Sequence, residues 1–128
     1  MLDNNRKIQY LKNEKIAKIV QQSLHFYDKK DFKLICYTIM PNHVHLVFYL
    51  FDDLKTVDKI MQSIKRYSAR EANKILKRIG SFWQSESFDH IVRDDDELGR
   101  IIKYVLYNPV KAKLVNDWKD WKFTYLAE

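Results

Sequence analysis

The most restrictive feature of this sequence is a pair of short apolar segments joined by Pro41-Asn42. Residues Phe32–Met40 are rich in β-branched and aromatic residues, which is typical of a strand. Residues His43–Phe51 form a second segment, close enough to predict an antiparallel hairpin. Side chains of a strand point alternately to opposite faces. One face then carries His43, His45, Val47 and Tyr49, and the other carries Val44, Leu46, Phe48 and Leu50.

Helical periodicity flanks the predicted hairpin on both sides. Asn13 is a suitable cap for the first helix. The third helix should end or bend at Asn108-Pro109, because the residue before proline avoids helical geometry. An extended segment, Ser81–Arg93, precedes that helix. The expected helices cover about Asn13–Asp28, then Thr56–Ile79, and finally a segment opened by the acidic run Asp94–Glu97.

This order of elements predicts an α+β fold in one domain, residues 1–128. We expect a ferredoxin-like or RRM-like antiparallel sheet with its helices packed on one face. The first strand of such a sheet is missing or shortened, since only Arg6–Tyr10 precede the first helix as a candidate. That strand is central and pairs with the strand that carries the histidines. Its loss would expose unpaired backbone groups, so we expect poor stability or dimerisation.

Composition narrows the functional classes. The single cysteine, Cys36, excludes an internal disulfide framework and a zinc site built of thiolates. Two glycines are too few for a glycine-rich phosphate loop. No segment approaches the ~20 apolar residues that span a bilayer. The polar start, Met1–Arg6, lacks the apolar core of a signal peptide. We therefore expect a cytoplasmic protein without a membrane partner.

Positive charge is concentrated in the predicted long helix. The chain has 23 Lys plus Arg and 17 Asp plus Glu, a net charge of +6. Residues 54–80 hold eight bases and only two acids, Asp58 and Glu71, which accounts for the whole excess. Such a segment attracts polyanions, nucleic acid first, although a solvated helix face has the same composition. The eight bases are Lys55, Lys59, Lys65, Arg66, Arg70, Lys74, Lys77 and Arg78.

Two pairs of side chains have a spacing suited to a metal-binding or catalytic site. His43 and His45 lie on one face of a strand and are close enough to share a cation. The same pattern also fits two surface histidines that are merely hydrogen-bonded. Two ligands are too few, so a third must come from elsewhere. Tyr104 and Asn108 share a helix face at positions i and i+4. A packing tyrosine and a capping asparagine would give the same pattern.

Three ordered blocks of this sequence resemble the REP-associated tyrosine transposases. These are single-strand DNA transposases with a His-hydrophobe-His motif and one catalytic tyrosine. The resemblance covers roughly residues 13–125 and departs from the family at Lys113, where glycine is usual. The blocks are Met40–Val47, then Phe82–Gln84 with Phe88–Arg93, and last Tyr104–Val115.

The resemblance implies a metal-dependent reaction at one site. His43, His45 and Asn108 would hold Mg²⁺ or Mn²⁺, because oxygen and imidazole ligands suit these ions better than a structural zinc. Tyr104 would attack phosphorus and leave a 5′-phosphotyrosine with a free 3′-hydroxyl. Tyr107 is the weaker candidate, because it does not pair with Asn108 in the same way.

The resemblance also implies a partner, single-stranded DNA beside a hairpin, and an enzyme that is a monomer or a homodimer. Tyr67, Phe82 and Trp83 could stack on bases or belong to the core. Two other functions stay open: a non-catalytic hairpin DNA- or RNA-binding protein of the same fold, and a metal-dependent hydrolase of another substrate. The expected phosphate contacts are Lys65, Arg66, Arg70, Lys74 and Lys77.

Overall fold

The computed structural model describes residues 9–30, 32–50, 57–83, 87–92 and 96–127, with residues 87–92 described by their backbone alone. Its helices are α1 (Glu14–Tyr27), α2 (Val57–Leu76), α3 (Leu98–Leu106) and α4 (Asn108–Lys111), with 3-10 turns η2 (Tyr10–Lys12) and η3 (Trp118–Asp120). Its strands are β1 (Phe32–Met40), β2 (His43–Leu50), β3 (Ser87–Val92) and β4 (Thr124–Leu126). The predicted α+β class is confirmed.

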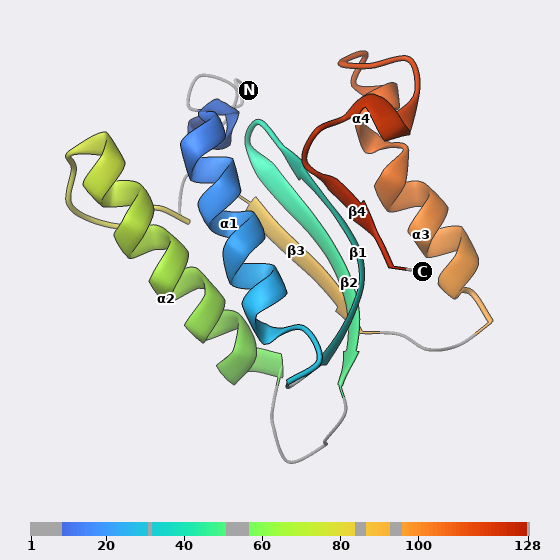
Figure 1. Cartoon of the computed structure of the whole chain (residues 1–128), viewed down its shortest axis with the longest axis horizontal. Helices are drawn as coiled ribbons and strands as arrows, with labels where there is room; N and C mark the ends of the chain where they lie inside the picture. The colour runs from blue at the N-terminus through green and yellow to red at the C-terminus, as the bar shows by residue number, and fades with distance from the viewer. Residues whose placement is uncertain (1–8, 31, 51–56, 84–86, 93–95, 128) are drawn as a thin grey trace, which may run out of the picture.

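The strands form one sheet in the order β3-β2-β1-β4 (Figure 1). β1 and β2 make the predicted antiparallel hairpin, with Met40 opposite His43 at its turn. β4 pairs antiparallel with the outer edge of β1. β3 pairs parallel with β2, and α2 makes the crossover that parallel neighbours require.

Helices cover both faces of this sheet. The larger core joins α1 and α2 to one face, through residues such as Leu46 and Phe48 of β2. A smaller core joins α3 to the opposite face, where Val105 and Leu106 pack with Val47. The two faces of β2 are therefore those that its alternation predicts.

The expectation that all helices pack on one face was wrong. The second face is itself apolar, because Val47 and the neighbouring Ile35 and Cys36 are buried there, and an apolar face needs a covering layer. A register shift between Leu34 and Cys36 contributes to this. An extra residue in a bulge places two successive side chains, Ile35 and Cys36, on the same side of the sheet.

The expectation of an exposed edge beside the histidine strand was also wrong. β3 occupies that edge, but it runs parallel to β2, whereas the first strand of a ferredoxin-like sheet would run antiparallel to the histidine strand. The sheet is therefore mixed, and the expectation of an antiparallel sheet throughout was wrong. The pairing of β3 satisfies the backbone groups of β2 from His43 to Phe48. Tyr10, the end of the candidate first strand, belongs to η2, and Arg6–Ile8 lie outside the described residues.

The helix ends follow local sequence signals. Asn13 caps α1 as predicted, with its Oδ1 accepting the Lys15 N–H at 2.9 Å. α3 ends at Leu106 and α4 begins at Asn108, so Pro109 produces the predicted bend. Of the acidic run, Glu97 precedes α3 without a side-chain capping bond, and Asp94 and Asp95 lie outside the described residues. Within the described part of the chain, no helix is both long and apolar enough to cross a membrane.

Candidate metal and tyrosine site

The predicted histidine pair is assembled at the start of β2. The rings of His43 and His45 lie 4.6 Å apart between centroids, at an angle of 83°. Both residues are half-buried on the α3 side of the sheet. Nδ1 of His43 lies 2.8 Å from Oδ1 of Asn42, an amide oxygen that only accepts. The proton of a neutral His43 ring is thus on Nδ1, and Nε2 carries the lone pair that a metal would need.

Tyr104 of α3 lies beside this pair. Its ring centroid is 6.2 Å from that of His45, and its side chain is 54% exposed. The next two residues, Val105 and Leu106, are buried against the sheet. Their burial orients the helix so that Tyr104 sits at the rim of the contact, next to the histidines and open to solvent.

Asn108 is one turn further along the same face. Its Nδ2 donates to the carbonyl of Tyr104 at 3.1 Å and to that of Val105 at 3.4 Å. Asn108 therefore caps the C-terminal end of α3, which is the capping role that the sequence pattern also allowed. These bonds use the amide nitrogen, and the oxygen is the atom that would ligate a metal, so a capping role and a ligand role are compatible.

The donor set limits which ions the site could hold. Among the described side chains, no group of three or more His, Cys, Asp or Glu could hold a metal. A third side-chain ligand from this part of the chain would therefore be an amide or hydroxyl oxygen, and Asn108 offers such an amide. Two imidazoles with an amide oxygen and no thiolate fit a catalytic Mg²⁺ or Mn²⁺ better than a structural zinc.

The other nucleophile candidates are placed elsewhere. Tyr107 lines a separate cleft of about 300 Å³, bordered by the 116–119 segment. Cys36 is fully buried, and burial raises the pKa of its thiol to about 12. A thiol in that state is unreactive at neutral pH. Tyr104 is thus the nucleophile candidate that the fold places beside the histidines.

One residue near the site was not singled out from the sequence. Nζ of Lys111 lies 5.5 Å from the ring centroid of Tyr104. A similar contact, 6.0 Å long, joins Lys103 to Tyr107. Lys111 is seven residues after Tyr104, a helical repeat of two turns, and this spacing is the signal that could have identified it.

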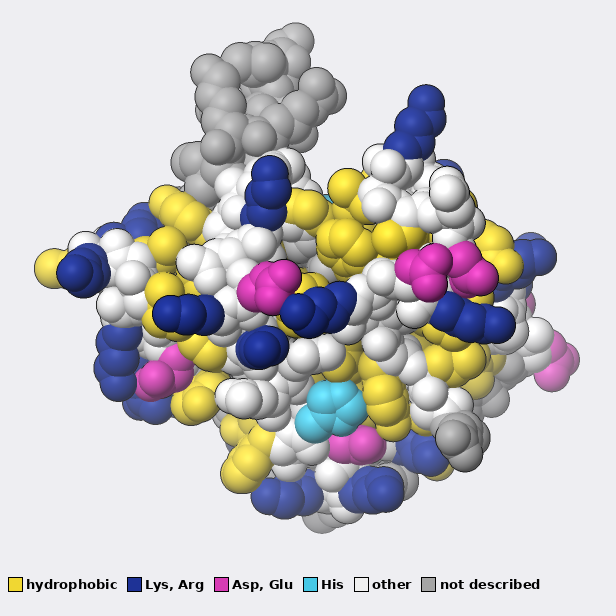
Figure 2. Space-filling view, turned by 45° about the horizontal axis from the view of Figure 1, so that its top comes forward, with side chains coloured by type: hydrophobic (Ala, Val, Ile, Leu, Met, Phe, Trp, Pro, Cys, Tyr) yellow, Lys and Arg dark blue, Asp and Glu magenta, His cyan; other side chains and the backbone are white. Residues whose placement is uncertain are grey.

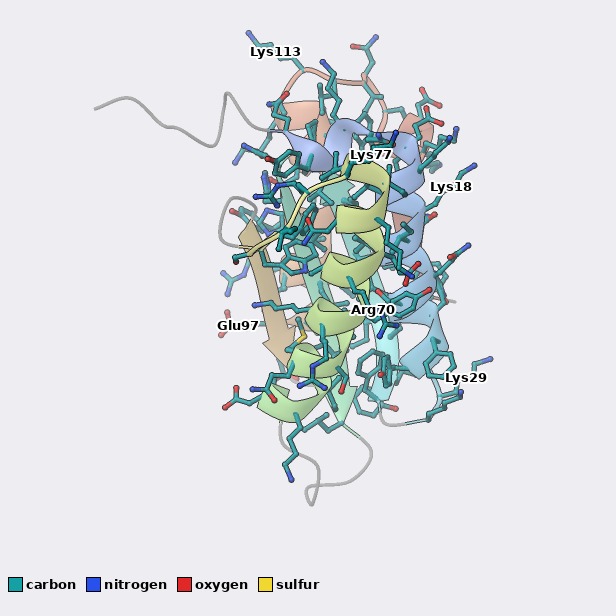
Figure 3. All side chains as sticks on the ribbon, turned by 90° about the vertical axis from the view of Figure 1, so that its left-hand side faces the viewer. Lys18, Lys29, Arg70, Lys77, Glu97 and Lys113 are labelled. Atoms are coloured by element: carbon teal, nitrogen blue, oxygen red, sulfur yellow. The ribbon has the colours of Figure 1, made fainter. Side chains whose placement is uncertain are left out.

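The predicted phosphate contacts lie on the opposite side of the sheet. Arg66, Arg70 and Lys74 are exposed on α2, and Lys77 follows its end, whereas Lys65 is half-buried (Figure 3). In the view of Figure 2, Lys and Arg side chains are spread over the visible face, with a few Asp and Glu side chains between them. The predicted phosphate contacts do not border the histidines, because the sheet lies between α2 and α3.

Electrostatic contacts on α2 are typical of an exposed surface. Glu71 accepts from Lys74 at 3.1 Å and from Arg70 at 3.4 Å, and these bonds, that of Lys74 first, lower the pKa of its carboxyl. Tyr67 is 39% exposed, and the guanidinium of Arg70 lies 5.7 Å from its ring centroid. Tyr67 is therefore not a buried core residue, and its stacking on a base stays a prediction.

The two other aromatic candidates are packing residues. Phe82 is buried in the larger core, and Trp83 packs on this core while its Nε1 donates to Oγ of Ser68 at 3.1 Å. The backbone of Asp89 pairs with that of His45 in the sheet. The side chain of Asp89 and the whole of Glu86 lie outside the described residues.

Comparison with known proteins gives the family. Residues 1–108 match the family of IS200-like transposases. A relative from Haemophilus influenzae, named as a REP-associated tyrosine transposase, is 28% identical over 102 residues, which cover 73% of this chain and 58% of the relative. A REP-associated tyrosine transposase of Escherichia coli K12 is 24% identical over 95 residues, covering 74% of this chain and 54% of the relative.

The chain thus spans little more than half the length of these curated relatives. No solved structure matches it. The matched residues nevertheless include both histidines, Tyr104 and Asn108. The fold places Tyr104 beside the two histidines, and Asn108 is hydrogen-bonded to the carbonyl of Tyr104. On this match, the chain belongs to the IS200-like transposase family.

Proposed function

We propose that residues 1–128 act as one catalytic domain that cleaves and rejoins single-stranded DNA beside hairpins. The observation that carries this proposal is the ring of Tyr104, 6.2 Å from that of His45 on the sheet face that also holds His43. A solvent-open phenol beside two imidazoles is suited to attack on a phosphate held at the same place. Family membership supports the reaction class.

His43, His45 and Asn108 would hold the divalent cation, Mg²⁺ or Mn²⁺. When bound, this ion polarises the scissile phosphate and balances the charge that builds on it. Asn42 supports the site, because its bond to Nδ1 holds the His43 ring in the tautomer that presents Nε2. The bonds of Asn108 to α3 fix its amide beside Tyr104.

Tyr104 would be the nucleophile. Its phenol oxygen forms a bond to phosphorus while the bond from phosphorus to the 3′ oxygen breaks. The 3′ oxygen leaves as a hydroxyl and takes up one proton, which balances the proton that the phenol loses. A second 3′-hydroxyl can then attack the phosphotyrosine, which restores Tyr104 and joins the strand without ATP. Lys111, beside the Tyr104 ring, favours the phosphate there by its charge.

The DNA hairpin would bind to the exposed bases of α2. Arg66, Arg70, Lys74 and Lys77 recur at intervals of three or four residues, so they form one stripe along the helix. Lys65 lies beside this stripe and is half-buried. Each phosphate that the stripe neutralises releases counterions, so binding should weaken as salt rises.

The test is the formation of a covalent protein–DNA adduct. Labelled single-stranded DNA carrying the hairpin that flanks the gene is incubated with Mg²⁺ or Mn²⁺ and analysed on a denaturing gel. We expect an adduct that requires metal and disappears in Tyr104→Phe. Tyr107→Phe is the matched control and should retain the adduct, because Tyr107 lies in a different cleft.

Other outcomes identify the alternatives. A band shift in a native gel that survives in Tyr104→Phe, with no adduct in the unmodified protein, would show a non-catalytic DNA-binding protein. Metal-dependent turnover without an adduct and without a need for Tyr104 would show a hydrolase. Sedimentation of the protein with and without DNA decides between monomer and homodimer.

A further inference from the structure

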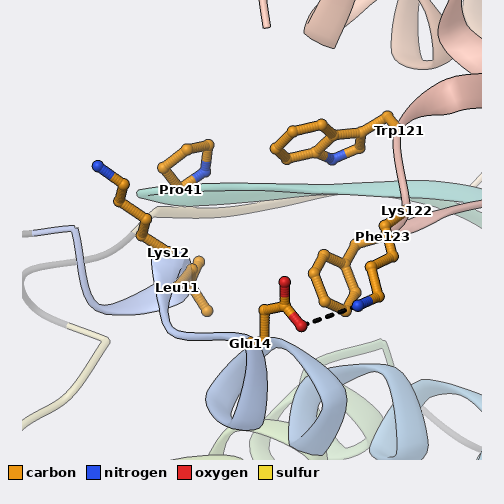
Figure 4. A pocket seen from close by; sticks show the side chains of 7 residues that line it. All are labelled: Leu11, Lys12, Glu14, Pro41, Trp121, Lys122 and Phe123. Carbon is orange, nitrogen blue, oxygen red and sulfur yellow. Dashed lines mark hydrogen bonds and ion pairs between the residues drawn. The ribbon is translucent and has the colours of Figure 1, made fainter. Parts of the chain in front are cut away.

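A small cavity of about 130 Å³ lies where η2 and the start of α1 meet the segment before β4 (Figure 4). It is larger than the ~30 Å³ of one water molecule and smaller than the ~300 Å³ of the smallest drug-sized pockets. It therefore fits a single flat ring rather than a whole nucleotide. Its lining residues are Leu11, Lys12, Glu14, Pro41, Trp121, Lys122 and Phe123.

The walls of this cavity are apolar and held in place. Trp121 donates from Nε1 to the carbonyl of Ile39 at 2.9 Å, and the N–H of Ile39 donates to the carbonyl of Phe123 at 3.0 Å. Leu11 and Phe123 are buried members of the larger core. Figure 4 shows Pro41 and Trp121 on one side of the cavity and Leu11 and Phe123 on the other. The space is thus bounded by flat and aliphatic groups that need not move to admit a ring.

The mouth of the cavity presents an acceptor and a donor side by side. Oε1 of Glu14 lies 2.8 Å from Nζ of Lys122, and both side chains are more than half exposed. The bond and charge of Lys122 lower the pKa of the Glu14 carboxyl, which keeps it ionised. Lys12 adds a further positive charge. A carboxylate beside an ammonium matches an exocyclic amino group beside a ring acceptor, as on the edges of adenine and cytosine.

The cavity borders the turn that leads into the histidine strand. Pro41, one of its walls, is in the β1–β2 turn and precedes His43 by two residues. The cavity lies on the α1 side of the sheet and His43 on the α3 side, so a single strand that contacts both would pass over the β1–β2 turn. Trp121, Lys122 and Phe123 lie beyond residue 108, where the family match ends, so this wall is a feature of the tail of this chain.

We propose that this cavity binds one nucleobase of single-stranded DNA next to the cleaved phosphate, stacked on Trp121, with its amino edge at Glu14 and Lys122. The inference rests on the proposed function for the position of that phosphate. It makes the tail a determinant of sequence preference: a base with an exocyclic amino group is favoured over thymine, which has none. We expect the preference to be at least about fivefold in dissociation constant.

The test measures binding of the full chain to hairpin oligonucleotides by fluorescence anisotropy at one salt concentration. Each nucleotide beside the cleavage position is replaced in turn by an abasic unit or by thymine. We expect one position where either change weakens binding, and Glu14→Gln should remove the discrimination against thymine there. Glu97→Gln is the matched control, since Glu97 is also an exposed acid paired with a base, Arg100, and it should keep the preference of the unmodified chain.

Two outcomes would overturn the proposal: no position that responds to loss of its base, or the same base profile in Glu14→Gln as in the unmodified protein. Thermal melting of each variant checks that the fold is retained. The adduct assay separates the two proposals. A Tyr104 adduct with a flat base profile refutes the base cavity alone, whereas a responsive position without an adduct refutes the catalytic function and leaves a DNA-binding cavity.

Discussion

Lys113 occupies a backbone position that glycine would fill at lower energy. Its φ of 63° is in the left-handed region. The N–H of Lys113 donates to the carbonyl of Val110, and that of Leu114 to the carbonyl of Pro109, both at 2.9 Å. These two bonds define a Schellman motif that ends α4, and its left-handed residue is most often glycine. Lys113→Gly should therefore stabilise the protein.

The magnitude follows from two opposing effects. Left-handed geometry costs an L-residue about 1–2 kcal/mol, which glycine avoids. Glycine also gives the unfolded chain more freedom, which lowers stability by about 0.4–1 kcal/mol. The Lys113 side chain is exposed, so few contacts are lost with it. The net gain should be about 0.5–1 kcal/mol, or about 2–5 °C in Tm for a domain of this size.

Urea and thermal unfolding, followed by circular dichroism, measure this gain. Lys113→Ala keeps the Cβ and the strain, so it should not increase the free energy of unfolding. Lys18→Gly is the matched control in the middle of α1, where glycine should destabilise by about 1 kcal/mol. If Lys113→Gly lowers the free energy of unfolding as Lys18→Gly does, the assignment of strain to Lys113 is refuted.

The same reasoning applies to two other lysines. Lys77, with a φ of 55°, ends α2 in a second Schellman motif, in which Arg78 bonds to Asn73. Lys29, with a φ of 69°, is the third residue of a turn closed by a 3.1 Å bond from Lys30 to Tyr27. Because the three lysines follow different elements, the increases in the free energy of unfolding from the three Lys→Gly substitutions should add.

Three further results are expected. Lys111→Ala should slow adduct formation about two- to fivefold at saturating DNA, the value of one exposed cation–π contact, while Lys103→Ala, beside the other tyrosine, should leave the rate unchanged. Asn13→Ala should lower the free energy of unfolding by about 1 kcal/mol in urea, through loss of the α1 cap. Burial lowers the pKa of His25 below its ordinary value of 6.5, so His25 takes up a proton at a higher pH in the unfolded chain than in the folded one. Stability should fall as pH drops below about 6.5, and His25→Gln should reduce that fall.

Local signals in the sequence were sufficient for the hairpin and the helices. The alternation of β2 predicts its two faces because a strand has only two, and the larger and smaller cores separate Leu46 from Val47 accordingly. Asn13 and Pro109 mark the start of α1 and the bend after α3, because capping and proline geometry act within one turn of the chain. The confirmed features thus depend on neighbours in sequence.

The features that the sequence did not predict depend on distant segments. The sequence predicts that Ser87–Val92 is extended, but it does not show which strand this segment pairs with, and β3 pairs parallel with β2. The apolar residues Ile35 and Cys36 could have indicated a second layer of helices, but the bulge that places both on one face has no local signature. The seven-residue spacing of Lys111 from Tyr104 is a local signal, but it predicts a shared face only if the helix continues past Pro109, where the sequence predicts an end or bend.

The arrangement of the sheet determines how a DNA strand can reach Tyr104. The basic stripe of α2 and the tyrosine of α3 are on opposite faces, so no straight path through the sheet joins them. Figure 1 shows that α2 ends at the same end of the molecule as the β1–β2 turn and α4. Lys77 and Lys113 also lie toward this end in Figure 3. If the hairpin binds α2 as proposed, the end of the sheet that carries Pro41 offers one route from the end of α2 to Tyr104. The cavity beside Pro41 lies on this route, which is why we expect the tail of the chain to contact the DNA.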